Sequence, residues 1–255
     1  MRKLWSIALL LSLAAGLHAG QVVRVFAAVS LRPLLSQLKF ERLHAAFPDC
    51  KVEFVYGGSP MLVAQLQQGL PGDLLITADS VNMEKAITAG LVAGRAHELC
   101  RNRLMLAVRK EAVKTVTSIK DLAAPKIRIA IGQRSVPAGN YAWKAIDKAA
   151  LVYGPKWRES VFHHVATEEP DVASVLAKVK FGAVDAGFVY ATDILSANGS
   201  VIGIELEKRF AVTGHYFVAA VRRGKVGLAR LLLDDLRSAE TERELLKLGY
   251  NVAHR

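Results

Sequence analysis

The stretch Tyr56–Asp79, YGGSPMLVAQLQQGLPGDLLITAD, contains the pattern around which the rest of the chain is organised. It follows a short strand of alternating apolar residues. The glycine pair Gly57 and Gly58 then permits a sharp turn, and we expect Ser59 to cap a helix that has Pro60 at its first position. A helix N-terminus behind such a turn presents unpaired N–H groups and the positive end of the helix dipole. This stretch therefore predicts an anion site.

The same transition from strand through small residues to helix recurs three more times. Ser30 follows an apolar strand and precedes a helix expected over residues 34–46. The loop around Ala138 leads into a helix expected from Asn140, and Val172 opens a helix that Asp171 should cap. Each transition alone is explained by an ordinary helix cap. Together, they favour one shared anion at the carboxyl ends of strands in an α/β protein.

Length and charge restrict the possible classes of protein. The chain has 255 residues, enough for two modest domains, and a formal net charge of +11. Residues 1–19 have the charged start, apolar run and small final residue of a secretory signal peptide, with cleavage expected after Ala19. Arg2 and Lys3 are the charged residues of that segment, so its removal leaves a chain of +9. The remaining basic residues are scattered, which argues against a dedicated nucleic-acid surface.

Motifs for catalysis are missing from the sequence. It contains no G-x-S-x-G elbow, no H-E-x-x-H and no P-loop, so we expect neither an enzyme nor a cofactor. His163 and His164 are expected in a strand, where they would point to opposite faces and not share a metal. Cys50 and Cys100 are the two cysteines; export permits a disulfide between them, and the sequence leaves their pairing open.

Five segments in register carry a resemblance that covers essentially the whole exported chain: FAAVSL, YGGSPMLVAQLQQGLPGDLLITAD, SVPAGNYA, EPDVASVLAKV and DAGFVYATD. They resemble the periplasmic molybdate-binding proteins of ABC transporters. The resemblance implies an α/β, two-lobe periplasmic binding protein fold of type II, each lobe a mainly parallel sheet flanked by helices. It also implies an oxyanion held by the hydroxyls of Ser30, Ser59 and Tyr190 and by the amides of Ala138 and Val172.

This chain departs from the family pattern at three places around that site. Pro60 has no N–H to offer the anion, and Gly57 and Gly58 replace a more serine-rich turn. Arg32 stands where small or polar residues are usual and is a candidate contact at the mouth of the cleft. These departures bear on anion preference more than on the fold.

The resemblance also predicts organisation and role. Residues 20–103 with 214–255 should form lobe 1, and residues 104–213 lobe 2. We expect a periplasmic monomer that binds molybdate or tungstate and delivers it to a membrane ABC permease, with molybdenum bound only as its oxyanion. Two alternatives stay open: a binding protein for sulfate or phosphate, and a basic exported protein that contacts nucleic acid or anionic lipid.

Overall fold

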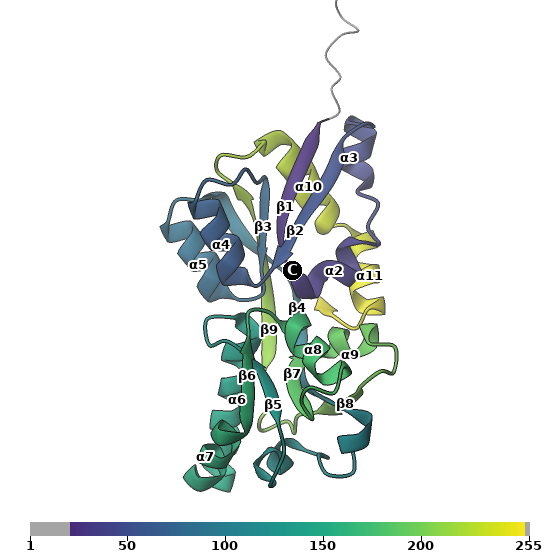
Figure 1. Ribbon diagram of the computed structural model, residues 1–255. Helices are drawn as coiled ribbons and strands as arrows, with labels where there is room; N and C mark the ends of the chain where they lie inside the picture. Colours follow the sequence, from purple (N-terminus) through teal and green to yellow (C-terminus); the bar gives the residue numbers. More distant parts are fainter. Residues whose placement is uncertain (1–20, 253–255) are drawn as a thin grey trace, which may run out of the picture.

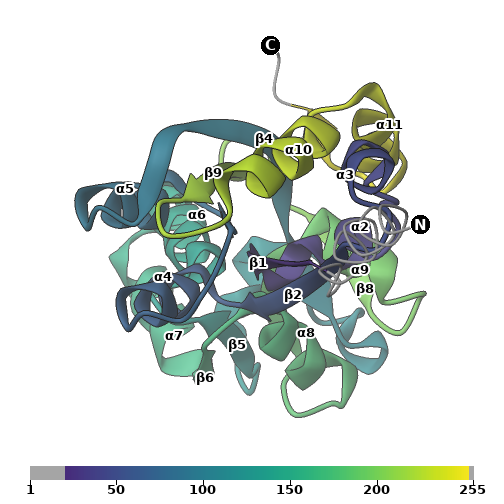
Figure 2. The same ribbon diagram turned by 90° about the horizontal axis from the view of Figure 1, so that it is seen from above.

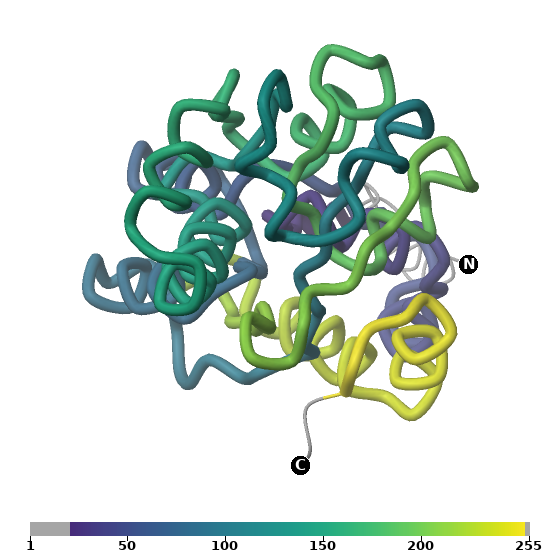
Figure 3. Tube along the Cα trace, turned by 90° about the horizontal axis from the view of Figure 1, so that it is seen from below, coloured from purple at the N-terminus to yellow at the C-terminus, as the bar shows by residue number. Residues whose placement is uncertain are grey.

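The computed structural model describes residues 21–252 and divides visibly into two halves stacked along the long axis of the molecule (Figure 1). The predicted signal peptide, residues 1–19, lies outside the described residues. Both ends of the described chain belong to the same half. Seen from below, the teal and green half lies in front of the purple and yellow one (Figure 3).

The half that contains both ends has these elements: β1 (Val22–Ala28), the 3-10 helix η1 (Val29–Leu31), α2 (Arg32–Leu35), α3 (Glu41–Ala46), β2 (Lys51–Gly57), α4 (Ser59–Gln67), β3 (Leu74–Thr77), α5 (Ser80–Thr88), α10 (Val226–Leu236), α11 (Ala239–Lys247) and β10 (Asn251–Val252). The other half has these: η2 (Lys110–Ala112), η3 (Ile119–Ala123), β5 (Ile129–Gly132), α6 (Pro137–Tyr153), α7 (Pro155–His164), β6 (Val165–Glu169), α8 (Val172–Lys180), β7 (Ala186–Tyr190), α9 (Ala191–Ser196) and β8 (Ile202–Glu205). Two long strands, β4 (Val92–Val108) and β9 (Thr213–Val221), connect the halves.

The described strands form one continuous pairing order, β2-β1-β3-β9-β4-β7-β5-β6, with β8 and β10 also paired to β4. β1 is parallel to β2 and β3, and β5 is parallel to β6 and β7. β4 is antiparallel to β9 up to Arg103 and to β7 from Leu104 onward. Because one strand changes partner between these two residues, the halves share a hydrogen-bonded spine. The lobe boundaries predicted from the sequence stay a prediction.

Each half encloses its own apolar core. In one, helices α6 and α8 bury Ile146 and Val175 against Phe188 of β7. In the other, Leu34 and Leu232 belong to a buried cluster beside β1. Figure 2 shows α3, α10 and α11 on one side of β1 and β2, with α4 and α5 on the other. Helices therefore cover both faces of this sheet, as the alternating sequence pattern predicts.

Two local expectations are wrong. The helix expected over residues 34–46 is interrupted, because Phe40 has a left-handed backbone (φ 52°) and packs its ring 6.0 Å from that of Phe54. His163 and His164 end helix α7 instead of lying in a strand. The Nδ1 atom of His164 is 2.9 Å from the carbonyl oxygen of Leu122, so this ring bonds the backbone of its own half.

Candidate functional site

A small cavity of about 20 Å³ lies where the two halves meet. Each site residue predicted from the sequence lines it: Ser30, Ser59, Ala138, Val172 and Tyr190. The remaining lining residues are Ala28, Val29, Gly57, Gly58, Ala78, Val136, Pro137 and Asp171. The cavity sits at the carboxyl ends of β1, β2 and β7, where sheets of this class bind ligands.

Ser30 is held by two tyrosines from distant parts of the chain, one at its side chain and one at its backbone. Its Oγ lies 2.8 Å from the hydroxyl of Tyr216, and the hydroxyl of Tyr250 donates to its carbonyl oxygen at 2.6 Å. Burial raises the pKa of both tyrosines well above its usual value, so both stay neutral and keep their protons. When Tyr216 donates to Ser30 Oγ, the Ser30 proton is available to a ligand in the cavity.

Ser59 does not cap its own helix, contrary to the sequence expectation. Gly58 occupies the cap position of α4, and Ser59 is the first helical residue. The Ser59 Oγ instead accepts a hydrogen bond of 3.0 Å from the backbone N–H of Ala78, beyond the end of β3. Since that bond uses an acceptor lone pair, the hydroxyl proton of Ser59 is likewise available to the cavity.

The two predicted amide donors lie at helix N-termini. Helix α6 begins at Pro137, three residues before the expected Asn140, which places Ala138 in its first turn. Val172 is the first residue of α8, and the Asp171 carboxylate caps that helix by accepting from Ser174 N at 2.8 Å. The first N–H groups of a helix have no partner within it, so these two amides are free for a ligand.

Tyr190 contributes a hydroxyl from the end of β7. The residue is 1% exposed, and its Oη makes no hydrogen bond of acceptable geometry within residues 21–252. Burial is the largest cause, and the field of Tyr141 the next, of a pKa well above the usual value for the Tyr190 hydroxyl. The Tyr216 hydroxyl lowers that pKa, but by less. A buried, neutral, unpaired donor is costly unless something accepts its proton. A ligand with acceptor oxygens would supply that partner.

Formal charge is nearly absent from the cavity wall. Asp171 is the charged side chain among the described lining residues, and it is occupied as a helix cap. Arg32 is not part of the lining, and its guanidinium lies 4.4 Å from the centre of the Tyr56 ring. An anion in this cavity would therefore be attracted by hydroxyls, amides and helix dipoles instead of by cations.

Contacts between the halves close the cavity. A Cβ atom added to Gly58 would overlap the carbonyl oxygen of Pro170 in the opposite half. The Tyr141 hydroxyl donates to the carbonyl oxygen of Ala78 at 3.3 Å, and burial raises its pKa to about 12. Asn102 Nδ2 donates to the Thr192 hydroxyl at 2.8 Å. These contacts correspond to an arrangement in which the halves have come together.

Sequence reasoning missed the two tyrosines that bond Ser30. Tyr216 and Ser30 are 186 positions apart, and Tyr250 and Ser30 are 220 apart. Tyr216 belongs to an ordinary strand pattern, and we find no sequence signal that would have identified either tyrosine.

Other kinds of site find little support in the described residues. Between residues 21 and 252, no cluster of three or more His, Cys, Asp or Glu side chains is arranged to hold a metal ion. Cys50 and Cys100 are both buried and both free. None of the helices in the same range is long and apolar enough to cross a membrane.

Comparisons with known proteins show the family to which the chain belongs. Residues 23–251 match the family model of bacterial extracellular solute-binding proteins. The molybdate-binding protein ModA of Mycobacterium tuberculosis is 30% identical over 227 residues, which cover 89% of this chain and 83% of that protein. The substrate-binding domain of a putative molybdenum ABC transporter from Clostridium difficile superposes with a TM-score of 0.65 at 27% identity, covering 92% of this chain and all of that one.

A third comparison bears on the fold alone. The sulfate-binding protein SubI of Mycobacterium tuberculosis superposes with a TM-score of 0.79 at 14% identity, over 91% of this chain and 87% of that one. The predicted two-lobe, type II architecture is confirmed by these similarities. The family match spans nearly all the described residues, and the chain belongs to the bacterial extracellular solute-binding proteins.

Proposed function

We propose that the protein captures a tetrahedral oxyanion, molybdate or tungstate, between its two halves and delivers it to a membrane ABC permease. The proposed ligands are Ser30, Ser59, Ala138, Val172 and Tyr190. The observation that carries the proposal is their convergence on one buried cavity from separate elements. Sequence identity of 30% to a protein named for molybdate binding supports this choice of anion.

The chemistry of the wall favours an anion without protons. The Ser59 hydroxyl accepts from Ala78 N–H, and the Ser30 hydroxyl can accept from Tyr216, so both can present donors to the cavity. Asp171 Oδ1 already accepts from Ser174 N, so a proton on the ligand would have to use the remaining acceptor capacity of this carboxylate. Phosphate keeps at least one proton near neutral pH, and Asp171 is the one carboxylate among the described lining residues that could accept it. We therefore expect phosphate to bind weakly.

Sulfate is the stronger competitor because it is fully deprotonated. It is smaller than molybdate or tungstate, which are nearly equal in size. In a cavity closed for the larger pair, sulfate would not reach every donor at good distance, and unmade bonds to buried donors are costly. The likeness to a sulfate-binding protein lies at 14% identity and does not bear on the ligand.

The remaining parts of the proposal concern location and organisation. Residues 1–19 act as a signal peptide that is cleaved after Ala19, and the mature protein works in the periplasm as a monomer without catalytic activity or cofactor. Residues 20–103 with 214–255 and residues 104–213 move as two lobes that close on the anion. Arg32 lies at the cleft mouth, outside the direct contacts.

Titration calorimetry with molybdate, tungstate, sulfate and phosphate tests the proposal. We expect tight binding of the first two and much weaker binding of the others. Ser59→Ala should lower molybdate affinity about tenfold or more, because it removes a donor to a charged ligand and unpairs Ala78 N–H. Ser36→Ala is the matched control, since Ser36 is exposed and bonds the carbonyl oxygen of Pro33.

The same measurement separates the alternatives. Comparable affinities for sulfate and molybdate would favour the sulfate-binding alternative. Absence of binding to all four anions would reject the proposal. A thermal shift with DNA or anionic vesicles in that case would favour a basic surface-binding protein.

A further inference from the structure

Tyr141 lies just behind the oxyanion site, on the helix that carries one of the proposed amide donors. It belongs to α6, three residues after Ala138, and residues at this spacing lie on the same face of a helix. The residue is buried, 7% exposed, and it does not line the cavity. The proposed function assigns no role to it.

The Tyr141 hydroxyl bonds two backbone groups outside its own half. It donates to the carbonyl oxygen of Ala78 at 3.3 Å and accepts from the N–H of His215 at 3.5 Å. A hydroxyl has one proton and two acceptor lone pairs, so it can serve both partners at once. Ala78 follows β3 in the opposite half, and His215 lies on the connecting strand β9.

Each of these backbone segments supports a serine that we propose as a ligand. Ala78 donates its N–H to Ser59 Oγ at 3.0 Å. His215 precedes Tyr216, whose hydroxyl lies 2.8 Å from Ser30 Oγ. One tyrosine hydroxyl therefore joins the two segments that bond the serine side chains.

The ring of Tyr141 also lies beside the third proposed hydroxyl ligand. A Cβ atom added to Gly214 would be 2.9 Å from the ring of Tyr190 and 3.1 Å from the ring of Tyr141, so both rings approach the same glycine. The field of Tyr141 is the second cause, after burial, of the raised pKa of the Tyr190 hydroxyl. Tyr141 is therefore connected to the surroundings of all three hydroxyl ligands.

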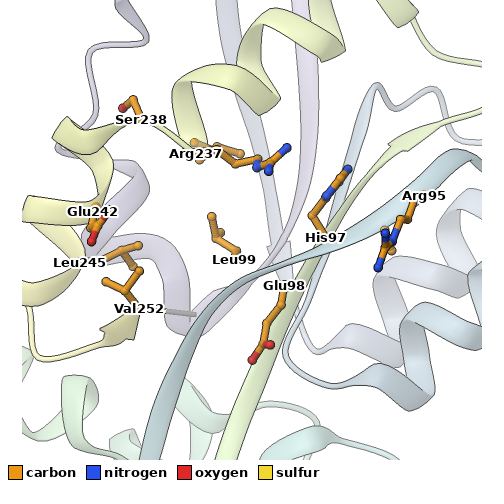
Figure 4. Close-up of a pocket in the computed structure, with 11 residues that line it drawn as sticks. Arg95, His97, Glu98, Leu99, Arg237, Ser238, Glu242, Leu245 and Val252 are labelled. Atoms are coloured by element: carbon orange, nitrogen blue, oxygen red, sulfur yellow. The ribbon is translucent and has the colours of Figure 1, made fainter. Parts of the chain in front are cut away.

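His215 is itself fixed by a side-chain contact to the neighbouring strand. Glu98 lies on β4, at the border of a separate cavity of about 420 Å³ (Figure 4). The His215 Nδ1 atom donates to a carboxylate oxygen of Glu98 at 2.7 Å, and Arg101 Nε donates to the same oxygen at 2.7 Å. The Tyr141 hydroxyl thus meets a backbone group that is held on the spine shared by the two halves.

We propose that Tyr141 is a positioning residue of the oxyanion site, which fixes the segments behind Ser59 and Ser30 when the halves come together. The inference rests on the proposed oxyanion function. Because the bond from Tyr141 to Ala78 joins opposite halves, its loss falls on the closed, anion-bound form. Displaced serine hydroxyls would make longer and weaker bonds to the anion. Loss of the Tyr141 hydroxyl should therefore weaken binding, although this residue does not touch the anion.

Titration calorimetry with molybdate compares the parent protein with Tyr141→Phe, which removes the hydroxyl and keeps the ring. We expect binding to be about tenfold weaker, because the buried carbonyl group of Ala78 loses its donor and the serine behind it is less well placed. Tyr153→Phe is the matched control on the same helix. Its hydroxyl bonds the exposed carboxylate of Glu207 at 3.2 Å, and its loss should leave molybdate affinity unchanged.

A double-mutant cycle shows whether Tyr141 acts through Ser59. In Ser59→Ala, the N–H of Ala78 no longer positions a ligand hydroxyl. Tyr141→Phe should then cost about threefold instead of tenfold, and the remaining loss comes from the segment behind Ser30. A residue that merely supports the fold would lower affinity by the same factor in both backgrounds.

Gly214→Ala provides a second test that keeps every tyrosine hydroxyl. The added methyl group would crowd the rings of Tyr141 and Tyr190, so molybdate binding should again weaken. Circular dichroism without the anion establishes that each variant is folded. Parental affinity in Tyr141→Phe or in Gly214→Ala, or equal factors in the two backgrounds, would overturn the positioning role and leave the oxyanion proposal intact. Absence of molybdate binding by the parent protein would reject both.

Discussion

Replacing Gly58 by alanine tests whether the two halves must touch beside the cavity for the anion to be held. Gly58 caps helix α4 in one half, and Pro170 precedes helix α8 in the other. A Cβ atom at position 58 would lie closer than 3.0 Å to the carbonyl oxygen of Pro170, a separation that real Cβ atoms essentially never show. Because both groups are backbone, no side-chain rotation relieves the overlap.

The expected loss of molybdate affinity follows from comparing the separated and the closed arrangement of the two halves. Gly58 has φ −67° and ψ 142°, an extended conformation that alanine adopts freely, so folding of the separated halves should be unaffected. In the closed arrangement the overlap must be relieved by moving one half, and overpacking of this kind costs about 1–3 kcal/mol. Since that cost falls on the bound form alone, molybdate affinity should drop by about 5- to 150-fold.

Titration calorimetry measures the affinity, and small-angle scattering with excess molybdate measures closure. The matched control is Gly227→Ala, because position 227 has open space around an added Cβ atom. We expect weaker binding and a larger radius of gyration for Gly58→Ala, with parental values for the control. Parental affinity together with full compaction in Gly58→Ala would refute the reasoning, because the contact would then have no part in closure.

Three further predictions concern groups within or just behind the site. Tyr190→Phe removes an unpaired buried donor and keeps the ring, so calorimetry should show about tenfold weaker molybdate binding; equal affinity would remove Tyr190 from the site. Tyr216→Phe removes the hydroxyl that bonds Ser30 Oγ, so molybdate binding should weaken by about two- to tenfold. Parental affinity in this variant would show that the bond from Tyr216 to Ser30 is not needed for binding. Burial raises the pKa of Asp193 to about 7, so the folded chain keeps a proton that the unfolded chain loses near its ordinary value of 3.8. The free energy of unfolding should therefore fall as pH rises through this interval, and urea titrations of Asp193→Asn should show a smaller fall; an unchanged pH profile would contradict this assignment.

Several elements could be read from neighbouring residues alone. The helix after Gly58 and the cap that Asp171 provides follow from turn and capping preferences, and the structure has both. The alternation of strands and helices predicted the layered architecture. The convergence of strand ends predicted a shared site, the family resemblance implied which residues would form it, and the cavity lining contains those residues. Their role as ligands stays a prediction.

Expectations that involved partners far away in the sequence were less successful. Strand β4 extends from Val92 through a stretch rich in charged residues, where pairing with β9 and not an apolar pattern makes it a strand. Ser59 was expected to cap its helix, yet its hydroxyl reaches Ala78 beyond the next strand. A local rule identifies a residue able to cap, but it does not show which of several acceptors or donors the folded chain brings within reach.

By itself, the sequence determined the alternation of strands and helices, the helix N-termini that border the cavity and the family resemblance, since these depend on residues close together in the chain. The tertiary structure alone decided the contact of Ser30 with Tyr216, the contact of Gly58 with Pro170 and the change of partner along β4 from β9 to β7. These features join segments separated by tens to hundreds of residues. Their geometry is set by how two cores and one shared spine pack, and no short-range preference encodes that packing.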